Sequence, residues 1–308
     1  MDALSDVLRD AGLRRRLLDQ RAFHARGALR FPCERSMGFH VVMRGRAWVH
    51  GPDLAEPLAL GAGDIALMAR GCTHVLATTA QQPAGEIAVA TIANGVPIAV
   101  PDTATVVVSG AYQFWNAPVH PLFASLPAWT RVQAGHDPAD APLAALLPLL
   151  AAEAGREGPG AEAILHGLLD AAFVYLLRAA LRGTPVLGWG RGIDDPRVRR
   201  AIGLLHAEPG RDWTLAALAR DAGLSRSALA LRFRAATGET PLNYLRGLRM
   251  QRAMRLLGES ARPLESVAAE VGYQDAFGFS RVFKRVVGLS PSAFRRRDAA
   301  ERASPMRL

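Results

Sequence analysis

The sequence predicts an α+β protein of several domains: an N-terminal β-barrel, a helical hairpin, and a C-terminal all-α domain with two helix-turn-helix units. Three observations lead to this prediction. Short apolar, β-branched runs separated by Gly and Pro turns occupy residues 1–137. Ala- and Leu-rich segments with helical spacing follow over 138–189. The segment 193–298 contains an internal repeat, and the last third of the chain carries the whole net charge.

The β-rich part is expected to fold as a sandwich or barrel, because its strand-like runs recur every 8–12 residues. The run Gly38–His50 is broken at Arg44-Gly45, which predicts two strands around a tight turn. Four further strands are predicted from β-branched and apolar runs. They are Ile65–Met68, Thr73–Ala77, Glu86–Ile92 and Thr103–Val108.

Two helices, Leu143–Ala154 and Ala161–Arg182, are predicted to form a hairpin around the turn Gly155–Gly160. The second helix carries an apolar stripe at a spacing of 3.6 residues. The stripe consists of Leu165, Leu168, Leu169, Ala172, Phe173, Leu176, Leu177 and Leu181. We expect the part not covered by the hairpin to bury a second subunit; the alternative is that it packs on its own β domain. A linker is predicted over Gly183–Gly192.

The charge is segregated along the chain. Residues 1–193 hold 16 Arg against 16 Asp and Glu, whereas residues 194–308 hold 21 basic against 12 acidic residues. The net charge of +9 therefore lies in the last third, which indicates an acidic partner such as nucleic acid. A high-GC coding bias would explain why 36 of the 37 basic residues are Arg, but not why they are segregated.

Several classes of protein are excluded by simple features. Two cysteines are too few for a disulfide scaffold or a Cys-only zinc site. The N-terminus has no apolar signal region, and the most apolar stretch, Ala161–Leu181, contains four polar or charged residues. We therefore expect a soluble, cytoplasmic protein with no membrane partner.

The internal repeat joins two copies of one supersecondary unit. Residues 215–223 (LAALARDAG) recur as 264–272 (LESVAAEVG), 49 residues later, and the pattern of 229–241 recurs in 279–291, 50 residues later. Each copy has the sequence pattern of a helix-turn-helix. In the first, Thr214 is a predicted N-cap, Gly223 supplies the turn, and Ser225 caps the second helix.

The second helix of each copy has one core face and one exposed face. Leu229, Phe233 and Ala236 form the core face in the first copy, and Phe279, Val282, Phe283 and Val286 form it in the second. The other side would enter a major groove. We assign DNA contacts to Ser225, Arg226, Ser227, Ala230, Leu231, Arg234, Gln274, Phe277, Ser280, Arg281, Lys284 and Arg285. An ordinary hairpin with a solvated face is the alternative, but such a face would mix charges of both signs.

Residues 195–297 resemble the DNA-binding domain of the AraC/XylS family of transcriptional regulators. The runs 213–257 and 267–296 carry the resemblance. It implies seven helices, with Leu242–Leu257 connecting the two helix-turn-helix units. The second helix of each unit, called its reader helix below, would occupy one of two successive major grooves of promoter DNA. RNA polymerase is a further implied partner. Leu231 stands where the family often has Arg, so we expect it to contact a thymine methyl. Gly278 weakens the second reader helix by roughly 1 kcal/mol relative to Ala.

The β part, over about residues 5–135, is similar to the cupin-like sensor domain of one AraC subgroup. The matching runs are 39–42, 63–74, and 120–122 with 126–127. The similarity implies a small β-barrel that binds a small-molecule effector or senses a reactive species. His40 and His74 occupy strand positions where cupins often place metal ligands. A metal would need a third ligand, with His24, Cys33 or Cys72 as candidates.

The metal-binding cupin pattern His-x-His followed by Glu is absent here, since Val41 and Val42 follow His40. We therefore expect two hydrogen-bonded histidines and no cofactor. Cys72 lies beside His74. One interpretation is that its thiol has a lowered pKa, and the other is that the side chain only packs. The subgroup often has a Cys where this chain has Ser109, so a two-cysteine switch is not expected.

Together these features predict a one-component, sequence-specific transcription regulator of the AraC type that is a homodimer and not an enzyme. The main alternative is a cupin-type metalloprotein or enzyme with a basic DNA-binding appendage. A second alternative is a nucleoid-like structural binder that has no effector. The operator, the effector and the direction of regulation are not encoded in any motif of the chain.

Overall fold

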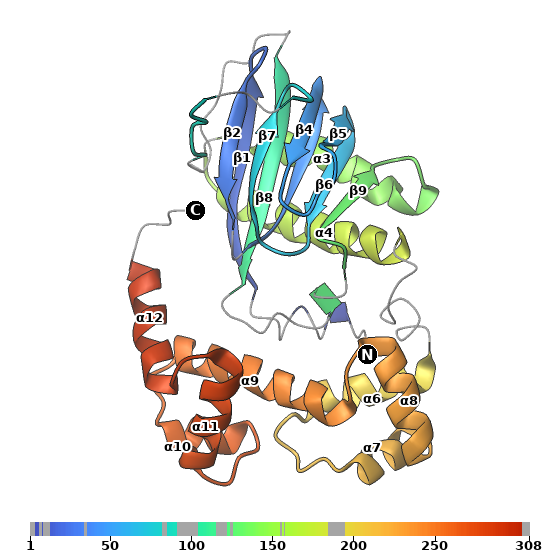
Figure 1. Ribbon diagram of the computed structural model, residues 1–308, viewed down its shortest axis with the longest axis vertical. Coiled ribbons are helices and arrows are strands. Elements are labelled where there is room, and N and C mark those ends of the chain that lie inside the picture. Colours follow the sequence, from blue (N-terminus) through green and yellow to red (C-terminus); the bar gives the residue numbers. More distant parts are fainter. Residues whose placement is uncertain are drawn as a thin grey trace. The chain divides into compact units, whose positions relative to one another are not determined.

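The computed structural model describes residues 4–5, 8, 13–33, 36–81, 85–90, 104–114, 122–123, 126–154, 156, 158–183 and 195–303. Contacts divide the chain into two compact units (Figure 1). One holds residues 14–113 and 126–184, and the other holds 185–307 together with 1–13 and 114–125. The expected linker beyond Gly183 and the run 120–121 lie outside the described residues.

The first unit is built on two sheets. Its strands among the described residues are β1 (Leu13–Phe23), β2 (Ala28–Pro32), β3 (Ser36–Arg44), β4 (Arg46–His50), β5 (Leu58–Gly61), β6 (Asp64–Met68), β7 (Thr73–Ala77), β8 (Thr105–Phe114) and β9 (Trp129–Gln133). Five of them form a sheet in the order β1-β8-β3-β6-β9, and four form a second sheet in the order β2-β7-β4-β5.

The strand predictions are confirmed where apolar runs end at turns. The break at Arg44-Gly45 separates β3 from β4, and Gly45 takes a φ of 84° that favours glycine. β6 and β7 match their predicted ranges, and β8 runs further than predicted. The prediction of a strand at Glu86–Ile92 is wrong for residues 86–90, where a single bridge joins Val89 to Arg30.

Four strands had no clear signal in the sequence. β1, β2, β5 and β9 are short or rich in polar residues, and β1 contains three consecutive arginines at 14–16. Their place in the sheets depends on pairing with distant strands, which residue patterns do not reveal.

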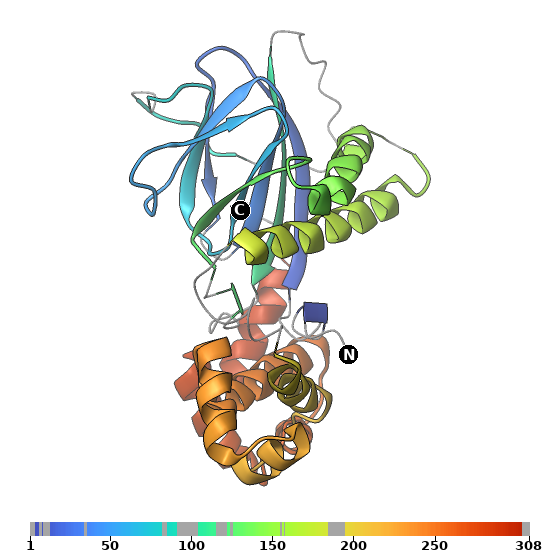
Figure 2. The ribbon, with the colours of Figure 1, turned by 90° about the vertical axis from the view of Figure 1, so that its right-hand side faces the viewer.

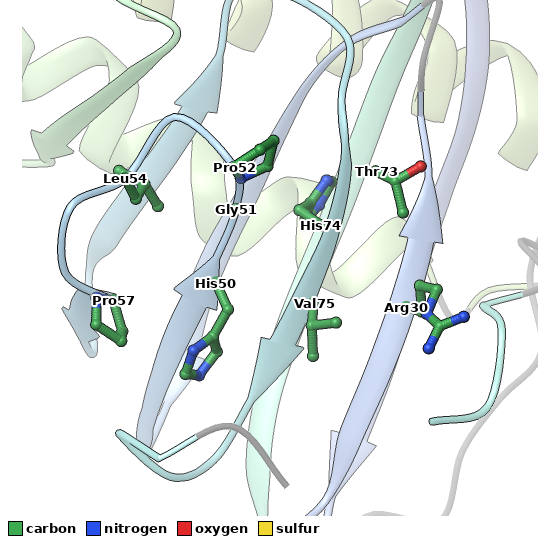
Figure 3. A pocket seen from close by; sticks show the side chains of 9 residues that line it. All are labelled: Arg30, His50, Gly51, Pro52, Leu54, Pro57, Thr73, His74 and Val75. Atoms are coloured by element: carbon green, nitrogen blue, oxygen red, sulfur yellow. The ribbon is translucent and has the colours of Figure 1, made fainter. Parts of the chain in front are cut away.

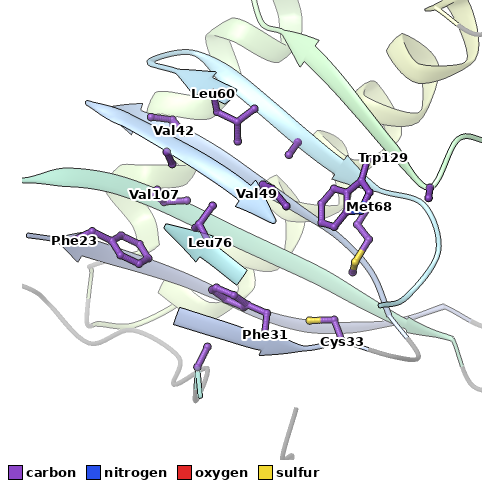
Figure 4. Close-up of a cluster of buried hydrophobic side chains, with 14 residues drawn as sticks. Phe23, Phe31, Cys33, Val42, Val49, Leu60, Met68, Leu76, Val107 and Trp129 are labelled. Carbon is purple, nitrogen blue, oxygen red and sulfur yellow. The ribbon is translucent and has the colours of Figure 1, made fainter. Parts of the chain in front are cut away.

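The core of this unit lies between the two sheets (Figure 4). Phe31, Val49 and Leu76 come from the four-stranded sheet, while Val42 and Val107 come from the five-stranded sheet. All five side chains are almost fully buried. The interior is therefore filled with packed side chains.

Two helices, α3 (Ala141–Ala154) and α4 (Ala161–Gly183), follow the short 3-10 helix η1 (Pro138–Asp140) and lie on one side of the five-stranded sheet (Figure 2). A Cβ on Gly110 of β8 would lie 2.7 Å from Leu169 of α4, so the helix passes very close to the sheet. The rings of Tyr112 and Phe173 stack with centroids 4.1 Å apart, and the Tyr112 hydroxyl donates to Asp170 at 2.8 Å.

This packing corrects the expectation for the apolar stripe of α4. Six of its eight residues are buried within the single chain, and only Leu168 and Leu181 are half-buried. The stripe packs on its own β domain, which was the alternative, because α3 and the outer face of the sheet already cover it. The helix Ala161–Arg182 has the length and apolarity of a membrane span, but a core helix packed in this way has the same composition.

The second unit contains seven helices between residues 195 and 303, as the family resemblance implies. They are α6 (Pro196–Ala207), α7 (Leu215–Ala222), α8 (Arg226–Thr237), α9 (Pro241–Glu259), α10 (Leu264–Glu270), α11 (Ala276–Val287) and α12 (Pro291–Ala303). The predicted connector at 242–257 is α9, which is slightly longer at both ends.

Candidate nucleic-acid interface and sensor residues

The first reader helix, α8, is fixed by its own sequence. The Ser225 hydroxyl accepts from the backbone N–H of Ala228 at 3.2 Å, which confirms the predicted cap, and Gly238 ends the helix at a φ of 78°. Leu229 and Phe233 are fully buried. The opposite side therefore faces away from the core. Of the six candidate contact residues, Ala230 is half-buried. The other five are exposed: Ser225, Arg226, Ser227, Leu231 and Arg234.

The second reader helix, α11, repeats this arrangement with a different cap. Asp275 accepts from the N–H of Gly278 at 2.6 Å, and a Cβ at Gly278 would lie only 3.0 Å from that carboxylate. The glycine that weakens the helix thus leaves room for the capping carboxylate. The candidate contact residues Gln274, Phe277, Arg281, Lys284 and Arg285 are exposed, and Ser280 is half-buried with its hydroxyl donating to the carbonyl of Ala276.

The core face of α11 is narrower than predicted. Phe279 and Phe283 are fully buried, whereas Val282 and Val286 are only half-buried. The two phenylalanines carry the packing of this helix, and their ring centroids are 5.5 Å apart.

Five cations of the reader helices have no acidic partner. Among the described residues, Arg226, Arg234, Arg281, Lys284 and Arg285 form no ion pair. Four other arginines of the unit are neutralised, since Arg211 and Arg220 bind Asp221, and Arg252 and Arg262 bind Glu270. The five unpaired cations leave the reader helices positive, which is the pattern expected of a phosphate-binding surface.

Arg232 is the exception among the basic residues of α8. Its guanidinium pairs with Asp195 at 3.3 Å. Burial opposes ionisation of Asp195, yet two backbone N–H groups and Arg232 lower the pKa of its carboxyl overall. Arg232 therefore holds α8 against the start of α6, a role that the sequence did not suggest.

At one pair of equivalent positions, the two reader helices carry side chains of different character. Leu231 of α8 corresponds to Arg281 of α11, 50 residues later, and both are exposed, Leu231 by 74%. Arg281 lies over the ring of Phe277 at 5.7 Å from its centroid, and Phe277 is itself 72% exposed. The first reader thus presents an apolar group where the second presents a guanidinium supported by an aromatic ring.

The loop between α6 and α7 contacts the turn of the second helix-turn-helix unit beside α9. Arg249 of α9 donates to the carbonyls of Pro209 and Arg211, both at 2.8 Å. A Cβ on Gly272 would lie 2.5 Å from the Gly210 carbonyl, so this loop and the turn at Gly272 are in close contact. The contact ties the first half of the unit to the second. Sequence reasoning missed Arg249 because its partners are backbone carbonyls about 40 residues away.

In the first unit, which carries the two sheets, His40 and His74 are both hydrogen-bonded, as predicted, and they also bond to each other. Their Nε2 atoms are 2.8 Å apart, His40 Nδ1 lies 2.7 Å from the Ser109 hydroxyl, and His74 Nδ1 lies 3.1 Å from the Cys72 carbonyl. A carbonyl only accepts, so His74 donates from Nδ1 and, in its neutral form, accepts at Nε2. His40 then donates from Nε2 and accepts from the Ser109 hydroxyl at Nδ1. All three hydrogen bonds are thus satisfied with both rings neutral.

The electrostatics of the pair agree with this proton arrangement. Burial, together with the neighbouring His74, holds the pKa of His40 well below its usual value. Burial lowers the pKa of His74 to about 4, although the bond to the Cys72 carbonyl opposes the shift. The pair links β7 of one sheet to β3 and β8 of the other.

The cysteines of this unit are not activated. Burial raises the pKa of the Cys33 thiol to about 12, and burial together with Asp53 raises the pKa of the Cys72 thiol. The expectation of a lowered Cys72 pKa is therefore wrong, since burial and the charge of Asp53 both disfavour the thiolate. Within the described part of the chain, no group of three His, Cys, Asp or Glu side chains is arranged to hold a metal ion.

Comparison with known proteins matches both units. A family model described as a cupin matches residues 2–182, and one described as a helix-turn-helix domain matches residues 218–297. The chain is 33% identical to an AraC-like transcription regulator of Streptomyces lividans, over 96% of this chain and 98% of that protein. A homologue of the same description from Streptomyces antibioticus is 31% identical over 96% of this chain and 99% of its own length.

Among solved structures, the DNA-binding domain of AdpA in complex with a target DNA is 31% identical and covers 36% of this chain and 99% of that chain, with a TM-score of 0.34. The two regulators from Streptomyces match almost from end to end, so the likeness extends over both units. The chain belongs to the AraC family of sequence-specific, DNA-binding transcription regulators and carries an N-terminal cupin domain.

Proposed function

We propose that α8 and α11 enter successive major grooves on one face of promoter DNA. The observation that carries this proposal is the set of five reader cations that form no ion pair among the described residues. Cations without acidic partners are available to phosphates and bases, and the contact between the Gly210 loop and the Gly272 turn supports a fixed spacing of the two reader helices.

The test is binding of the full chain to a site selected from random DNA, followed by fluorescence anisotropy on that site and on a scrambled one. We expect Lys284→Gln to weaken binding to both DNAs. Arg178→Gln, which removes an exposed charge from α4, should change neither. Equal affinity of the native chain for selected and scrambled DNA would instead favour a nucleoid-like binder.

A dimer is the expected assembly, but its interface must differ from the stripe of α4. The outward faces of α3 and α4 support an alternative place. Residues 141–152 of α3 contain no charged side chain, and Leu149 and Ile164 are 58% and 51% exposed. Apolar side chains exposed on neighbouring helices are a common feature of subunit contacts.

Sedimentation of a Leu149→Glu, Ile164→Glu variant tests this interface. We expect a monomer, while Val89→Glu, at another exposed apolar residue, should leave the dimer intact. An unchanged dimer in the double variant would place the interface elsewhere. Glu at Leu169 or Leu176 is unsuitable for this purpose, because both side chains are buried in the fold of one chain.

The cupin domain is proposed to bind a small-molecule effector and to have no catalytic role. Two neutral, mutually bonded histidines form a structural link, and they offer no charged acid or base for a reaction. We infer no resident cofactor, a cytoplasmic location next to the chromosome, and RNA polymerase as a partner at the promoter. Metal analysis of purified full-length protein, with a stoichiometric metal as the contrary result, tests the cofactor part.

A further inference from the structure

The outer face of the four-stranded sheet carries a hollow of about 480 Å³ that the proposed function does not use (Figure 3). Its floor is a row of three side chains from hydrogen-bonded strands: Arg30 of β2, Val75 of β7 and His50 of β4. Arg30 pairs with Val75, and Val75 pairs with His50, so the three lie directly side by side. The volume lies in the range of sites for small organic molecules.

The walls of the hollow are apolar, and its base is rigid. Pro52, Leu54 and Pro57 from the loop between β4 and β5 line one side. On the other side, the backbone of Arg30 is held at both ends: its N–H donates to the Ala88 carbonyl at 2.9 Å, and its carbonyl accepts from Ala90 at 2.8 Å. The backbone of Arg30, and with it the direction of the Cα–Cβ bond, is therefore fixed by hydrogen bonds on both edges of the strand.

Charge favours one kind of ligand. The Arg30 side chain is exposed and forms no ion pair among the described residues, and no Asp or Glu lines the hollow. A guanidinium binds a carboxylate with two parallel hydrogen bonds. A single permanent cation suits one negative charge better than two, which favours a carboxylate over a phosphate.

His50 defines the far end of the hollow. Its Nε2 donates to the Thr79 carbonyl at 3.3 Å, which leaves Nδ1 as a free acceptor in the neutral ring. Two strand spacings separate it from Arg30, or roughly 10 Å. A flat molecule could place a carboxylate at the Arg30 guanidinium and a hydroxyl at His50 Nδ1, with its apolar body over the side chain of Val75 between them.

We propose that this hollow binds an aromatic or similarly flat organic monocarboxylate, with the carboxylate on Arg30, the apolar body over Val75, and a hydroxyl near His50. The inference rests on the proposed effector role of the cupin domain and names the chemical class of that effector. It places the ligand outside the sheets, because packed side chains fill the space between them.

The test is isothermal titration calorimetry of the full chain, without DNA, with four probes: 2-naphthoate, 6-hydroxy-2-naphthoate, 2-naphthamide and 2-naphthyl phosphate. We expect the two carboxylates to bind at least about tenfold more tightly than the neutral amide, since a charged hydrogen bond is lost in the amide. The hydroxylated carboxylate should bind most tightly, and the phosphate should bind more weakly than 2-naphthoate.

Variants locate the site. Arg30→Gln should weaken 2-naphthoate binding by about tenfold or more and leave the amide unaffected, while the matched control Arg70→Gln, at an exposed arginine outside the hollow, should change nothing. Thr73→Glu, at an exposed position on the rim, should weaken the carboxylates in the same way, and Thr73→Gln should not.

Three results would overturn the inference: no carboxylate binding with a Kd below about 1 mM, equal binding of amide and carboxylate, or unchanged binding in Arg30→Gln. Preference for the phosphate would overturn the carboxylate class. DNA binding of the same preparations is measured in parallel. Failure of the probes with intact DNA binding would reject the hollow alone, whereas loss of sequence-specific DNA binding in the native chain would reject the proposed function.

Discussion

Arg281 offers the sharpest test of how the second reader distinguishes base pairs. It is the sixth residue of α11, exposed, without an ion pair among the described residues, and placed over the ring of Phe277 at 5.7 Å. The ring holds the guanidinium towards the N-terminal part of the helix, where side chains reach base edges. Arg285 lies one turn later and is expected to contact the backbone phosphates.

The expected cost of Arg281→Ala is about 1–3 kcal/mol on the selected site, the value of one bidentate base contact, and close to zero on scrambled DNA. Arg281→Leu reproduces the chemistry of Leu231 at the equivalent position of α8 and should shift the preference at one base pair towards thymine. Arg285→Ala is the control. It should weaken both DNAs alike and reduce the salt dependence of log affinity by about 0.9.

The assay is binding-site selection with each variant, followed by anisotropy titrations over a series of salt concentrations. Identical selected sequences for the native chain and for Arg281→Ala would refute the base-reading role. The same outcome together with a reduced salt slope would assign Arg281 to a phosphate.

Three other predictions address the rest of the molecule. A fragment of residues 190–308 should bind DNA alone, with a slope of log affinity against log salt of roughly −3 to −4 if the four reader cations other than Arg281 contact phosphates; a flat response would contradict the electrostatic argument. The cupin domain should lose at least about 2 kcal/mol of unfolding free energy between pH 7 and pH 5, measured by urea unfolding, because the folded pKa of His74 is about 4 and the unfolded chain takes up a proton near 6.5. The pKa of His40 is also lowered and acts in the same direction, so His74→Gln should reduce this dependence without abolishing it, and exposed His136→Gln should not change it. Gly272→Ala should destabilise the C-terminal helical unit and broaden the tolerated spacing between half-sites in selection experiments, since its Cβ would collide with the Gly210 carbonyl. An unchanged melting temperature and an unchanged spacing would show that the Gly210 loop and the Gly272 turn are not tightly coupled.

Sequence alone determined the features that depend on neighbouring residues. The caps at Ser225 and Thr214 and the left-handed glycine at Gly223 follow from rules that act within about four residues, whereas the range of α9 followed from the family resemblance. The repeat and the segregated charge identified the two reader helices because both are properties of the linear order. Hydrogen bonds of His40 and His74 were also expected, but only the structure shows that the two rings bond to each other, to Ser109 and to the Cys72 carbonyl.

Tertiary structure decided which of these surfaces remain free. The stripe of α4 was read correctly as apolar, but only its packing on Gly110 and Tyr112, about 60 residues earlier, showed that it is already covered. Arg232 is a basic residue of a reader helix, but Asp195, 37 residues earlier in the chain, pairs with it. The hollow at Arg30 likewise exists only because three strands bring distant side chains into one row. Long-range strand pairing and helix packing set burial, ion pairing and cavities, and local sequence periodicity contains no information on the partner across the fold.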